Sequence, residues 1–334
     1  DGCLPGLAER GLLQRLDWIA DHIDAQLPQG FEAKAEALEA ALPPPLDPTR
    51  SDDDFGRFIH AVPGVLAVPH GRDHPDRALD LLHQATQRFS MEVYIRPFFL
   101  WHRDKTLTRL HLWKEDPNYH VRRLVSEGTR PKLPWAQALP ADPSVTLPLL
   151  RVLHGDATRY VTRSVANHLN DLSKTHPEVV VDALRDWQGA GQQQPKELAW
   201  ITRHALRTAV KRGERGALDL LGYRAGDISA TLSLPDAARI GEAIEICVTL
   251  DAPVDTPVMI DYRLQFQRPT GASEKVFKLR TGTLRAGQPQ EFRKAHKLKG
   301  DATTFRLHPG AHRITVQVNG QDVASAPFDL LPQQ

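Results

Sequence analysis

The chain has 334 residues, 41% of them hydrophobic and 25% charged, which is ordinary for a globular protein and long enough for two domains. No apolar run approaches the ~20 residues that a membrane-spanning helix needs, and no secretory signal is visible, so we expect a cytoplasmic protein that does not bind a membrane. The two cysteines, Cys3 and Cys247, lie in regions that we assign to different domains, which argues against a disulfide framework.

Charge is distributed unevenly along the chain, although the net charge is only +1. Residues 1–87 carry 7 basic and 15 acidic residues, whereas residues 88–163 carry 13 basic and 7 acidic ones. A second basic region, residues 263–313, has 12 basic and 3 acidic residues. Two basic regions in a nearly neutral chain indicate an anionic partner such as nucleic acid, although solvated surface charge explains the same pattern.

The N-terminal part shows the apolar spacing of short helices. Large aliphatic residues recur every three or four positions from Leu12 to Leu27, and a second helix is expected from Phe31 to Leu42. The stretch from Asp47 to Asp54 is polar and reads as a connection. A further helix is predicted from Pro75 to about Arg88, because proline suits a first helical turn.

The next predicted helix begins near Ser90. A serine can cap a helix, and Glu92 would then lie in the first turn, where the helix dipole favours a carboxylate. Pro97 is expected to kink or end this helix.

Three arginines at a spacing of forty residues, Arg123, Arg163 and Arg203, mark an internal repeat. The segment from Asp116 to Val125 aligns with the segment from Asp156 to Val165 at the same offset. A period of about 40 residues built from helix pairs predicts a HEAT-like solenoid, an array that buries one face of each pair against its neighbours.

The longest break in this array, from Gly128 to Ser144, contains Arg-Pro-Lys-Leu-Pro-Trp at residues 130–135. Such a stiff, basic loop with an aromatic tip is a candidate functional element, since long loops in repeat proteins often carry function.

The hydrophobic period changes from 3.6 to 2 near Tyr223, which predicts a β-rich domain. The expected strands are Ser229–Ser233, Ile244–Leu250, Met259–Phe266, Glu274–Leu279, Glu291–Leu298, His312–Val318 and Val323–Leu330. Asn319-Gly320 between the last two is a strong hairpin signal. The fold class is therefore multidomain α + β, with a HEAT-like domain at residues 1–222 and an immunoglobulin-like sandwich at residues 223–334.

Two segments resemble the AlkC-type DNA alkylation-repair glycosylases. One is Ser-Glu-Gly-Thr-Arg-Pro-Lys-Leu-Pro-Trp at residues 126–135, and the other is Arg-Ser-Val-Ala-Asn-His-Leu-Asn-Asp at residues 163–171. The resemblance extends to Glu92 within residues 90–97 and covers the whole chain. It implies excision of positively charged bases, 3-methyladenine and 3-methylcytosine, from double-stranded DNA during base excision repair, by contact from the minor groove without base flipping.

The resemblance also implies roles for individual residues. Glu92, Glu127 and Asp171 match acidic active-site positions, which makes them the candidate catalytic residues. The candidate DNA-binding residues of the first domain are Arg123, Arg130, Lys132, Trp135 and Arg163.

The chemistry of the reaction also favours carboxylates. An alkylated base that carries a positive charge leaves readily, so the remaining barrier is the cationic sugar that forms as the glycosidic bond breaks. Carboxylates stabilise such a cation and orient or deprotonate water, as glycoside hydrolases show. The reaction needs water and no metal or other cofactor, and we expect a monomer.

Each candidate also has a structural interpretation that the sequence leaves open. Glu127 and Asp171 suit surface ion pairs or a helix end, and Glu92 suits a helix dipole. Trp135 suits a core anchor for its loop, and the repeat arginines suit internal pairing with Asp116, Asp156 or other repeat acids.

Basic residues of the second domain are further candidates for DNA contact, namely Lys278, Arg280, Lys294 and Lys297, although edge lysines also discourage aggregation. For the whole chain, the alternatives to an enzyme are a protein-interaction scaffold and a DNA-structure-binding protein without catalysis. Release of free base from methylated DNA separates the enzyme from both.

Overall fold

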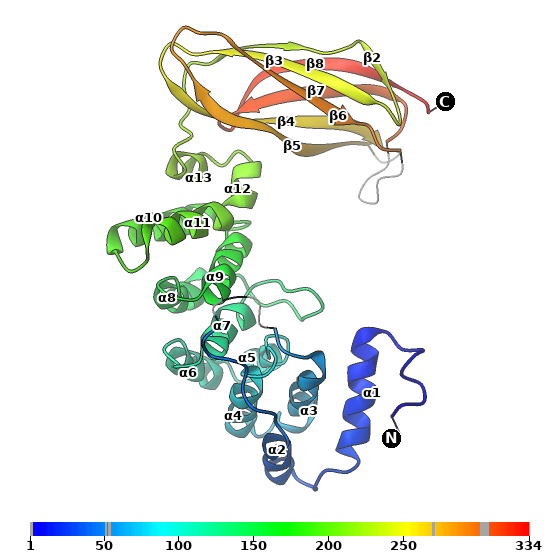
Figure 1. Cartoon of the computed structure of the whole chain (residues 1–334), viewed down its shortest axis with the longest axis vertical. Helices are drawn as coiled ribbons and strands as arrows, with labels where there is room; N and C mark the ends of the chain where they lie inside the picture. The colour runs from blue at the N-terminus through cyan, green and yellow to red at the C-terminus, as the bar shows by residue number, and fades with distance from the viewer. Residues whose placement is uncertain (1–2, 51, 53–54, 269–270, 301–306, 334) are drawn as a thin grey trace. The chain divides into compact units, whose positions relative to one another are not determined.

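The computed structural model describes residues 3–50, 52, 55–268, 271–300 and 307–333 (Figure 1). The chain divides into two compact units, Asp1–Leu206 and Arg207–Gln334. The described part of the first unit consists of helices and their connections, and the second contains two short helices followed by strands.

The helices of the first unit are α1 (Leu12–Asp24), α2 (Phe31–Ala40), the 3-10 helix η1 (Phe58–Ala61), α3 (Val62–His70), α4 (Pro75–Thr86), α5 (Ile95–Trp101), α6 (Arg103–Trp113), α7 (Tyr119–Gly128), α8 (Pro143–Leu153), α9 (Arg159–Leu172), α10 (Pro177–Ala190) and α11 (Pro195–Ala205). From α6 onward they form successive pairs, and the second helices of the pairs, α7, α9 and α11, contact one another in order. The HEAT-like array expected from the repeat is therefore present.

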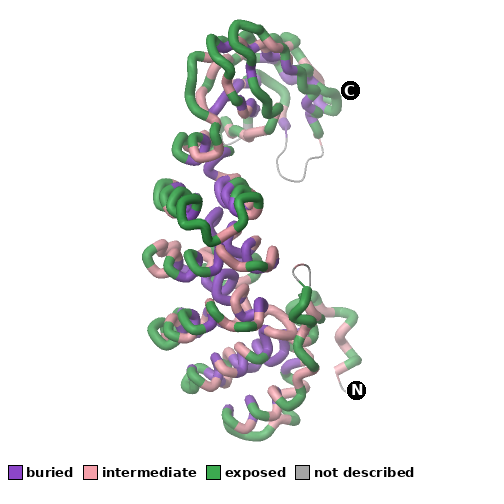
Figure 2. Tube along the Cα trace, turned by 60° about the vertical axis from the view of Figure 1, so that its left-hand side comes forward, coloured by how far each residue is buried: buried purple, intermediate pink, exposed green. Residues whose placement is uncertain are grey.

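The repeat period arises from apolar residues that recur at the contact between pairs. The aligned positions are completely buried in all three second helices, and they are Val121, Val125, Val161, Val165, Ile201 and Ala205. Figure 2 shows that buried residues concentrate where the helices meet, while exposed residues cover their outer sides. This seam is one extended hydrophobic core.

The repeat acids have a structural role, but their partners differ from those expected. Asp156 accepts a hydrogen bond from the backbone N–H of Thr158 at 2.8 Å, just before α9. It also pairs with Arg122 at 2.5 Å, which ties α7 to the next repeat. Asp116 pairs with His83 at 2.8 Å. The alternative of internal pairing applies to the repeat arginines with other acids, since Arg123 pairs with Glu92 and Arg163 pairs with Asp52.

Two expectations for the segment before α5 were also wrong. Ser90 does not cap a helix and Glu92 does not lie in a first helical turn, because both lie in the turns before Ile95. Pro97 does not end α5, which continues to Trp101. It is the third residue of that helix, where its missing N–H breaks no hydrogen bond.

The strands of the second unit are β1 (Ser229–Ser233), β2 (Ala237–Arg239), β3 (Ala243–Asp251), β4 (Thr256–Arg268), β5 (Gly271–Leu284), β6 (Gln290–Lys297), β7 (Gly310–Val318) and β8 (Gln321–Leu331). They form a three-stranded sheet in the order β1-β3-β6 and a five-stranded sheet in the order β2-β8-β7-β4-β5. Alternating residues of β3, β4 and β7 are buried in the hydrophobic core that the two sheets share. Every expected strand is present, and β2 is an addition.

The turn between β7 and β8 has the expected hairpin conformation. Asn319 and Gly320 both have positive φ, 48° and 79°, as a type I′ turn requires. The Asn319 amide donates to the carbonyls of Arg224 and Pro257 at 2.8 and 2.9 Å. This turn packs on the connection between α12 (Arg207–Lys211) and α13 (Arg215–Leu220), where Gly213 approaches Gly320 closely.

The predicted boundary between residues 222 and 223 falls in the connection between α13 and β1. The contacts of the Asn319 turn explain why α12 and α13 group with the strands rather than with the preceding repeats. Cys3 and Cys247 are both free thiols. Among the residues that the structure describes, no helix has the length and apolar character to cross a membrane.

Candidate active site

Glu127 lies in the last turn of α7, and its carboxylate is almost completely buried. Its Oε1 accepts a hydrogen bond from Nη1 of Arg130 at 2.5 Å, and its Oε2 accepts one from the Ser164 hydroxyl at 2.6 Å. Nη2 of Arg123 lies 3.8 Å from Oε2. Burial by itself would raise the pKa of Glu127, but Arg123, Arg130 and Ser164 together hold it below its usual value. The acid is therefore ionised in the folded protein.

Asp171 lies near the end of α9 and shares Arg130 with Glu127. Nε and Nη2 of Arg130 donate to Oδ2 of Asp171 at 2.9 and 2.8 Å. Lys174 donates to the other oxygen at 2.7 Å. One guanidinium thus joins two carboxylates that adjacent repeats supply, and the side chains of these acids are only 6% and 5% exposed.

Glu92 joins the same group of charges through Arg123. Its Oε2 accepts hydrogen bonds from Arg123 and from the Ser90 hydroxyl, both at 2.7 Å. The Arg123 guanidinium lies over the ring of Tyr160, 4.4 Å from its centroid. Positive and negative charges therefore alternate along a charge row made of Glu92, Arg123, Glu127, Arg130 and Asp171.

The arginines of the charge row remain cationic although they are buried. Burial opposes the charged form of Arg123, but Glu92 and Glu127 outweigh it and raise its pKa above the usual value. The pKa of Arg130 is raised in the same way, because Glu127 and Asp171 outweigh the desolvation. Glu127 thus lies between two fixed cations, at a place where no solvent reorganisation is needed.

Glu92 is the acid of the charge row that faces open space. A cavity of about 550 Å³ is lined by Glu92, Arg123, Tyr160 and Trp135, by the acid Asp17 of α1, and mostly by apolar side chains of α1, α3 and the segments around them. The side chain of Glu92 is 25% exposed. Glu127 and Asp171 are not among the residues that line this cavity.

Trp135 lies on the surface at the tip of the loop between α7 and α8. The residue is 79% exposed and has φ of 60°, a left-handed conformation that is uncommon for a tryptophan. Leu133 and Leu139 of the same loop are buried, so they anchor the loop while the indole points away from the core. The interpretation of Trp135 as a core anchor was therefore wrong. Lys132 is exposed next to it.

Arg163 and Arg203 are not part of the charge row. Arg163 forms an ion pair with Asp52, which lies in the connection before η1. Arg203 is exposed near the end of α11. Of the three repeat arginines, only Arg123 lies against the candidate acids. The Asp47–Asp54 connection falls partly outside the described residues.

The basic residues of the second unit lie on two edge strands. Lys278 and Arg280 belong to β5, the edge of the five-stranded sheet, and Lys294 and Lys297 belong to β6, the edge of the three-stranded sheet. All four are exposed, and β5 and β6 contact each other. They therefore form a basic edge of the sandwich, which is defined here by these four residues.

Sequence reasoning missed a buried polar layer beneath Glu127. The Ser164 hydroxyl contacts both Glu127 and the Ser126 hydroxyl, the latter at 2.9 Å. His168, one turn further along α9, bonds the Ser126 carbonyl through Nδ1 at 3.0 Å. The sequence does not predict this layer, because serine and histidine are ordinary residues in a repeat helix. Only the packing of α9 against α7 brings them beneath the acid.

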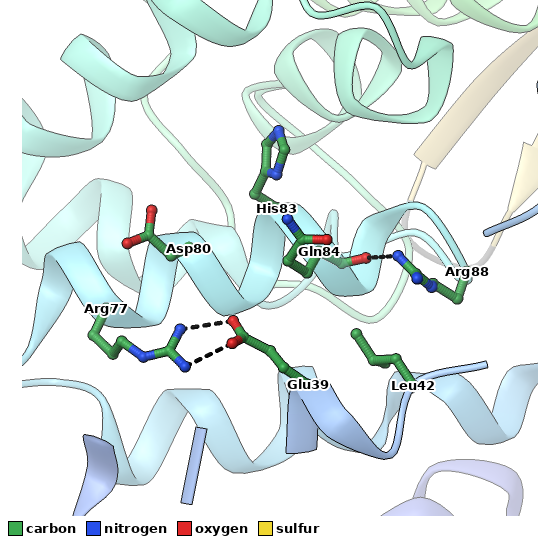
Figure 3. A pocket seen from close by; sticks show the side chains of 7 residues that line it. All are labelled: Glu39, Leu42, Arg77, Asp80, His83, Gln84 and Arg88. Carbon is green, nitrogen blue, oxygen red and sulfur yellow. Dashed lines mark hydrogen bonds and ion pairs between the residues drawn. The ribbon is translucent and has the colours of Figure 1, made fainter. Parts of the chain in front are cut away.

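A second hollow, between α2 and α4, contains none of the predicted site residues. Its lining includes Glu39, Arg77, His83 and Arg88, and its volume is about 370 Å³ (Figure 3). Arg77 donates to both oxygens of Glu39 at 2.6 and 2.7 Å, and Arg88 donates to the backbone carbonyl of Gln84 at 2.9 Å. These charged groups already have partners, so the hollow is a structural contact between two helices.

Comparison with known proteins agrees with this architecture. Residues 228–332 match the model of a protein family described as "Uncharacterised protein YhaZ, C-terminal Ig-like domain". Protein YhaZ of Bacillus subtilis (strain 168), itself described as uncharacterized, is 36% identical over 288 residues, which are 83% of this chain and 79% of YhaZ.

A solved structure of the alkylpurine DNA glycosylase AlkC from Pseudomonas fluorescens, bound to DNA that contains an abasic site analogue, superimposes with a TM-score of 0.83. The two sequences are 34% identical, and the match covers 98% of this chain and 90% of the AlkC chain. The chain belongs to the AlkC family. Membership confirms the resemblance seen in residues 126–135 and 163–171, and it confirms the combination of a HEAT-like array with an immunoglobulin-like sandwich. The charge row of this AlkC-family chain contains all three acids that the resemblance singled out.

Proposed function

We propose that the protein is a monofunctional DNA glycosylase that hydrolyses the N-glycosidic bond of cationic alkylated bases, 3-methyladenine and 3-methylcytosine, in double-stranded DNA. The observation that carries this proposal is the convergence of Glu127 and Asp171 on Arg130, with Glu92 joined to them through Arg123. A cationic sugar is the species that such fixed carboxylates stabilise, and membership of the AlkC family supports the same reaction.

The three acids have different roles in this proposal. Glu92 is the most exposed of them and faces the cavity, so it is the acid that contacts the deoxyribose or the attacking water. Glu127 and Asp171 lie behind the arginines and supply negative potential from a site with little water, where a charge acts more strongly than in solution. The leaving base already carries a positive charge, so departure neutralises it and no general acid is required.

The neighbouring basic and aromatic residues hold the DNA. In this proposal Lys132 and Arg163 neutralise backbone phosphates, and Arg123 and Arg130 keep the carboxylates from repelling the strand. The exposed indole of Trp135 can fill the space at a distorted base step, as apolar wedges do in other proteins that bind the minor groove. Extraction of the base from the helix is not part of the proposal.

The test is release of free base from methylated DNA, measured by chromatography in single turnover. We expect the parent protein to release 3-methyladenine, and Glu92→Gln and Glu127→Gln each to lower the rate by about 10²-fold while affinity for undamaged DNA stays nearly unchanged. Glutamine keeps the shape and removes only the charge.

Glu115→Gln is the matched control, because Glu115 is an exposed acid just after α6, away from the charge row. Its rate should equal that of the parent. DNA binding by the parent without base release would identify a DNA-structure-binding protein, and failure to bind DNA would favour an interaction scaffold. Parental rates in Glu127→Gln would remove that acid from the mechanism.

A further inference from the structure

Arg96 is the largest completely buried side chain of the protein's described residues, and it makes an unusual set of contacts. It lies in the first turn of α5, where it is not exposed to solvent at all. No ion pair with a carboxylate holds it among the described residues. A buried arginine usually has such a partner, because an uncompensated buried charge is costly.

The partners of Arg96 are backbone carbonyls of a single segment. Nη1 donates to the carbonyls of Gly128 at 3.1 Å and Arg130 at 2.7 Å, and Nη2 donates to that of Pro131 at 3.3 Å. Nε donates to the carbonyl of Gln137 at 2.6 Å. One planar group thus ties together the two ends of residues 128–137, which we call the tip loop.

Two further contacts fix the ends of the tip loop. Leu139 donates its N–H to the Pro131 carbonyl at 3.0 Å, so this carbonyl is bound both by Leu139 and by Arg96. Gly128 lies so near α5 that a Cβ there would meet Cγ2 of Ile95 at 2.6 Å, so the loop begins directly against the helix that carries Arg96. Trp135, in its left-handed conformation, lies exposed between these fixed ends.

We infer that Arg96 is a positioning residue, which fixes the tip loop so that Arg130 and Trp135 are held at the charge row. The inference rests on the proposed function for its catalytic consequence. Arg130 must bridge Glu127 and Asp171 with its backbone carbonyl bound to Arg96, and Trp135 must keep one orientation to act on DNA. Lysine cannot replace Arg96, because a single ammonium cannot reach carbonyls at both ends of the loop.

The first measurement is hydrogen–deuterium exchange of the free protein, parent against Arg96→Lys and Arg96→Met. We expect amides of residues 129–139 to exchange faster by about tenfold or more, while α7 and α9 keep their protection. Arg88→Lys is the matched control, since Arg88 also donates to two carbonyls, those of Pro43 and Gln84, outside the site. It should leave exchange in the tip loop unchanged.

The second measurement is single-turnover excision. We expect Arg96→Lys to lower the rate by about 10–10²-fold with little change in affinity for undamaged DNA, because misplacement by about 1 Å is enough for such a loss. In a Trp135→Ala background the same substitution should cost less, since part of its effect acts through that side chain.

Three results would overturn the inference. The first is unchanged exchange in the tip loop of the Arg96 variants. The second is loss of protection throughout the unit, which includes failure of both variants to fold. The third is faster exchange in the tip loop with base excision at the parental rate. Absence of base release by the parent would instead refute the proposed function, and the exchange data alone would then decide whether Arg96 fixes the loop.

Discussion

At the scale of single residues, the site is a balance between burial and charge. Each carboxylate of the charge row has at least one arginine, and each of these arginines serves two acids. Removing one partner would leave a buried charge without compensation, which typically costs 3–5 kcal/mol.

His168 gives the residue-scale prediction, a dependence of stability on pH. Burial lowers the pKa of His168 to about 4, and its Nε2 has no hydrogen-bond partner among the described groups. In the unfolded chain its pKa is about 6.5, so between pH 4 and 6.5 only the unfolded state takes up the proton. Stability should therefore fall as pH drops through this window, and this contribution is absent above about pH 6.5.

The measurement is urea unfolding of the parent and of His168→Gln at pH 7.5 and pH 5. Because pH 5 lies 1.5 units below the pKa of the unfolded state, protonation of His168 on unfolding should lower the parent's free energy of unfolding by about 2 kcal/mol. His168→Gln should not show this loss. His111→Gln, at an exposed position of α6, is the control and should follow the parent. Equal losses in His168→Gln and the parent would show that another group governs this pH range.

At the scale of elements, the tip loop combines two properties that rarely occur together. Its ends are fixed by buried groups, while its largest side chain, that of Trp135, is exposed to solvent. An exposed tryptophan adds little to folding, because it has scarcely any buried surface to lose. The proposed contact with DNA gives this residue a role that folding does not.

Trp135→Ala gives the element-scale prediction. We expect base excision to fall by at least about tenfold, because base steps that lose an aromatic contact lose about 1–3 kcal/mol. The free energy of unfolding should change by less than about 0.5 kcal/mol. Leu112→Ala is the control, because Leu112 is also an exposed apolar residue but lies on α6, and it should change neither quantity. A large loss of stability in Trp135→Ala would show that the indole supports the fold after all.

The elements that sequence reasoning found are those whose burial is periodic. Val121, Val125, Val161 and Val165 recur because every second helix packs on the next, so period and helix coincide. The helix α3 gave no such signal, since it is short, apolar on all sides and interrupted by Pro69.

The candidate site could be predicted from the sequence only in part, because its contacts join different helices and follow no period within one helix. The acids were named from family resemblance, but their convergence depends on the register of α7 against α9, which one sequence does not specify. The sequence could not identify Arg96 as a positioning residue, because its partners are backbone carbonyls, which every residue has.

At the scale of the whole molecule, the two units carry different parts of the proposed task. The charge row belongs entirely to the first unit, and the basic edge belongs entirely to the second. If both touch one DNA molecule, affinity must depend on phosphates that lie outside the reacting nucleotide, and salt must reveal them.

The salt dependence of binding gives the whole-molecule prediction. Changing Lys278, Arg280, Lys294 and Lys297 together to glutamine should weaken DNA binding and reduce the slope of log affinity against log salt by up to about 3 to 4, close to one for each lost phosphate contact. Arg285→Gln is the control, because Arg285 already pairs with Asp255 at 2.5 Å. A slope equal to that of the parent would exclude the basic edge from the DNA interface.

The double attachment of Arg130 has a consequence for how this protein varies. Because one guanidinium satisfies acids from two repeats, positions 127, 130 and 171 are thermodynamically coupled, and the effects of changing them should not add. A chain that has lost one of the three gains little by keeping the others. Natural relatives should therefore exchange these residues as a set, and a lineage that drifts at one position should soon lose the whole group.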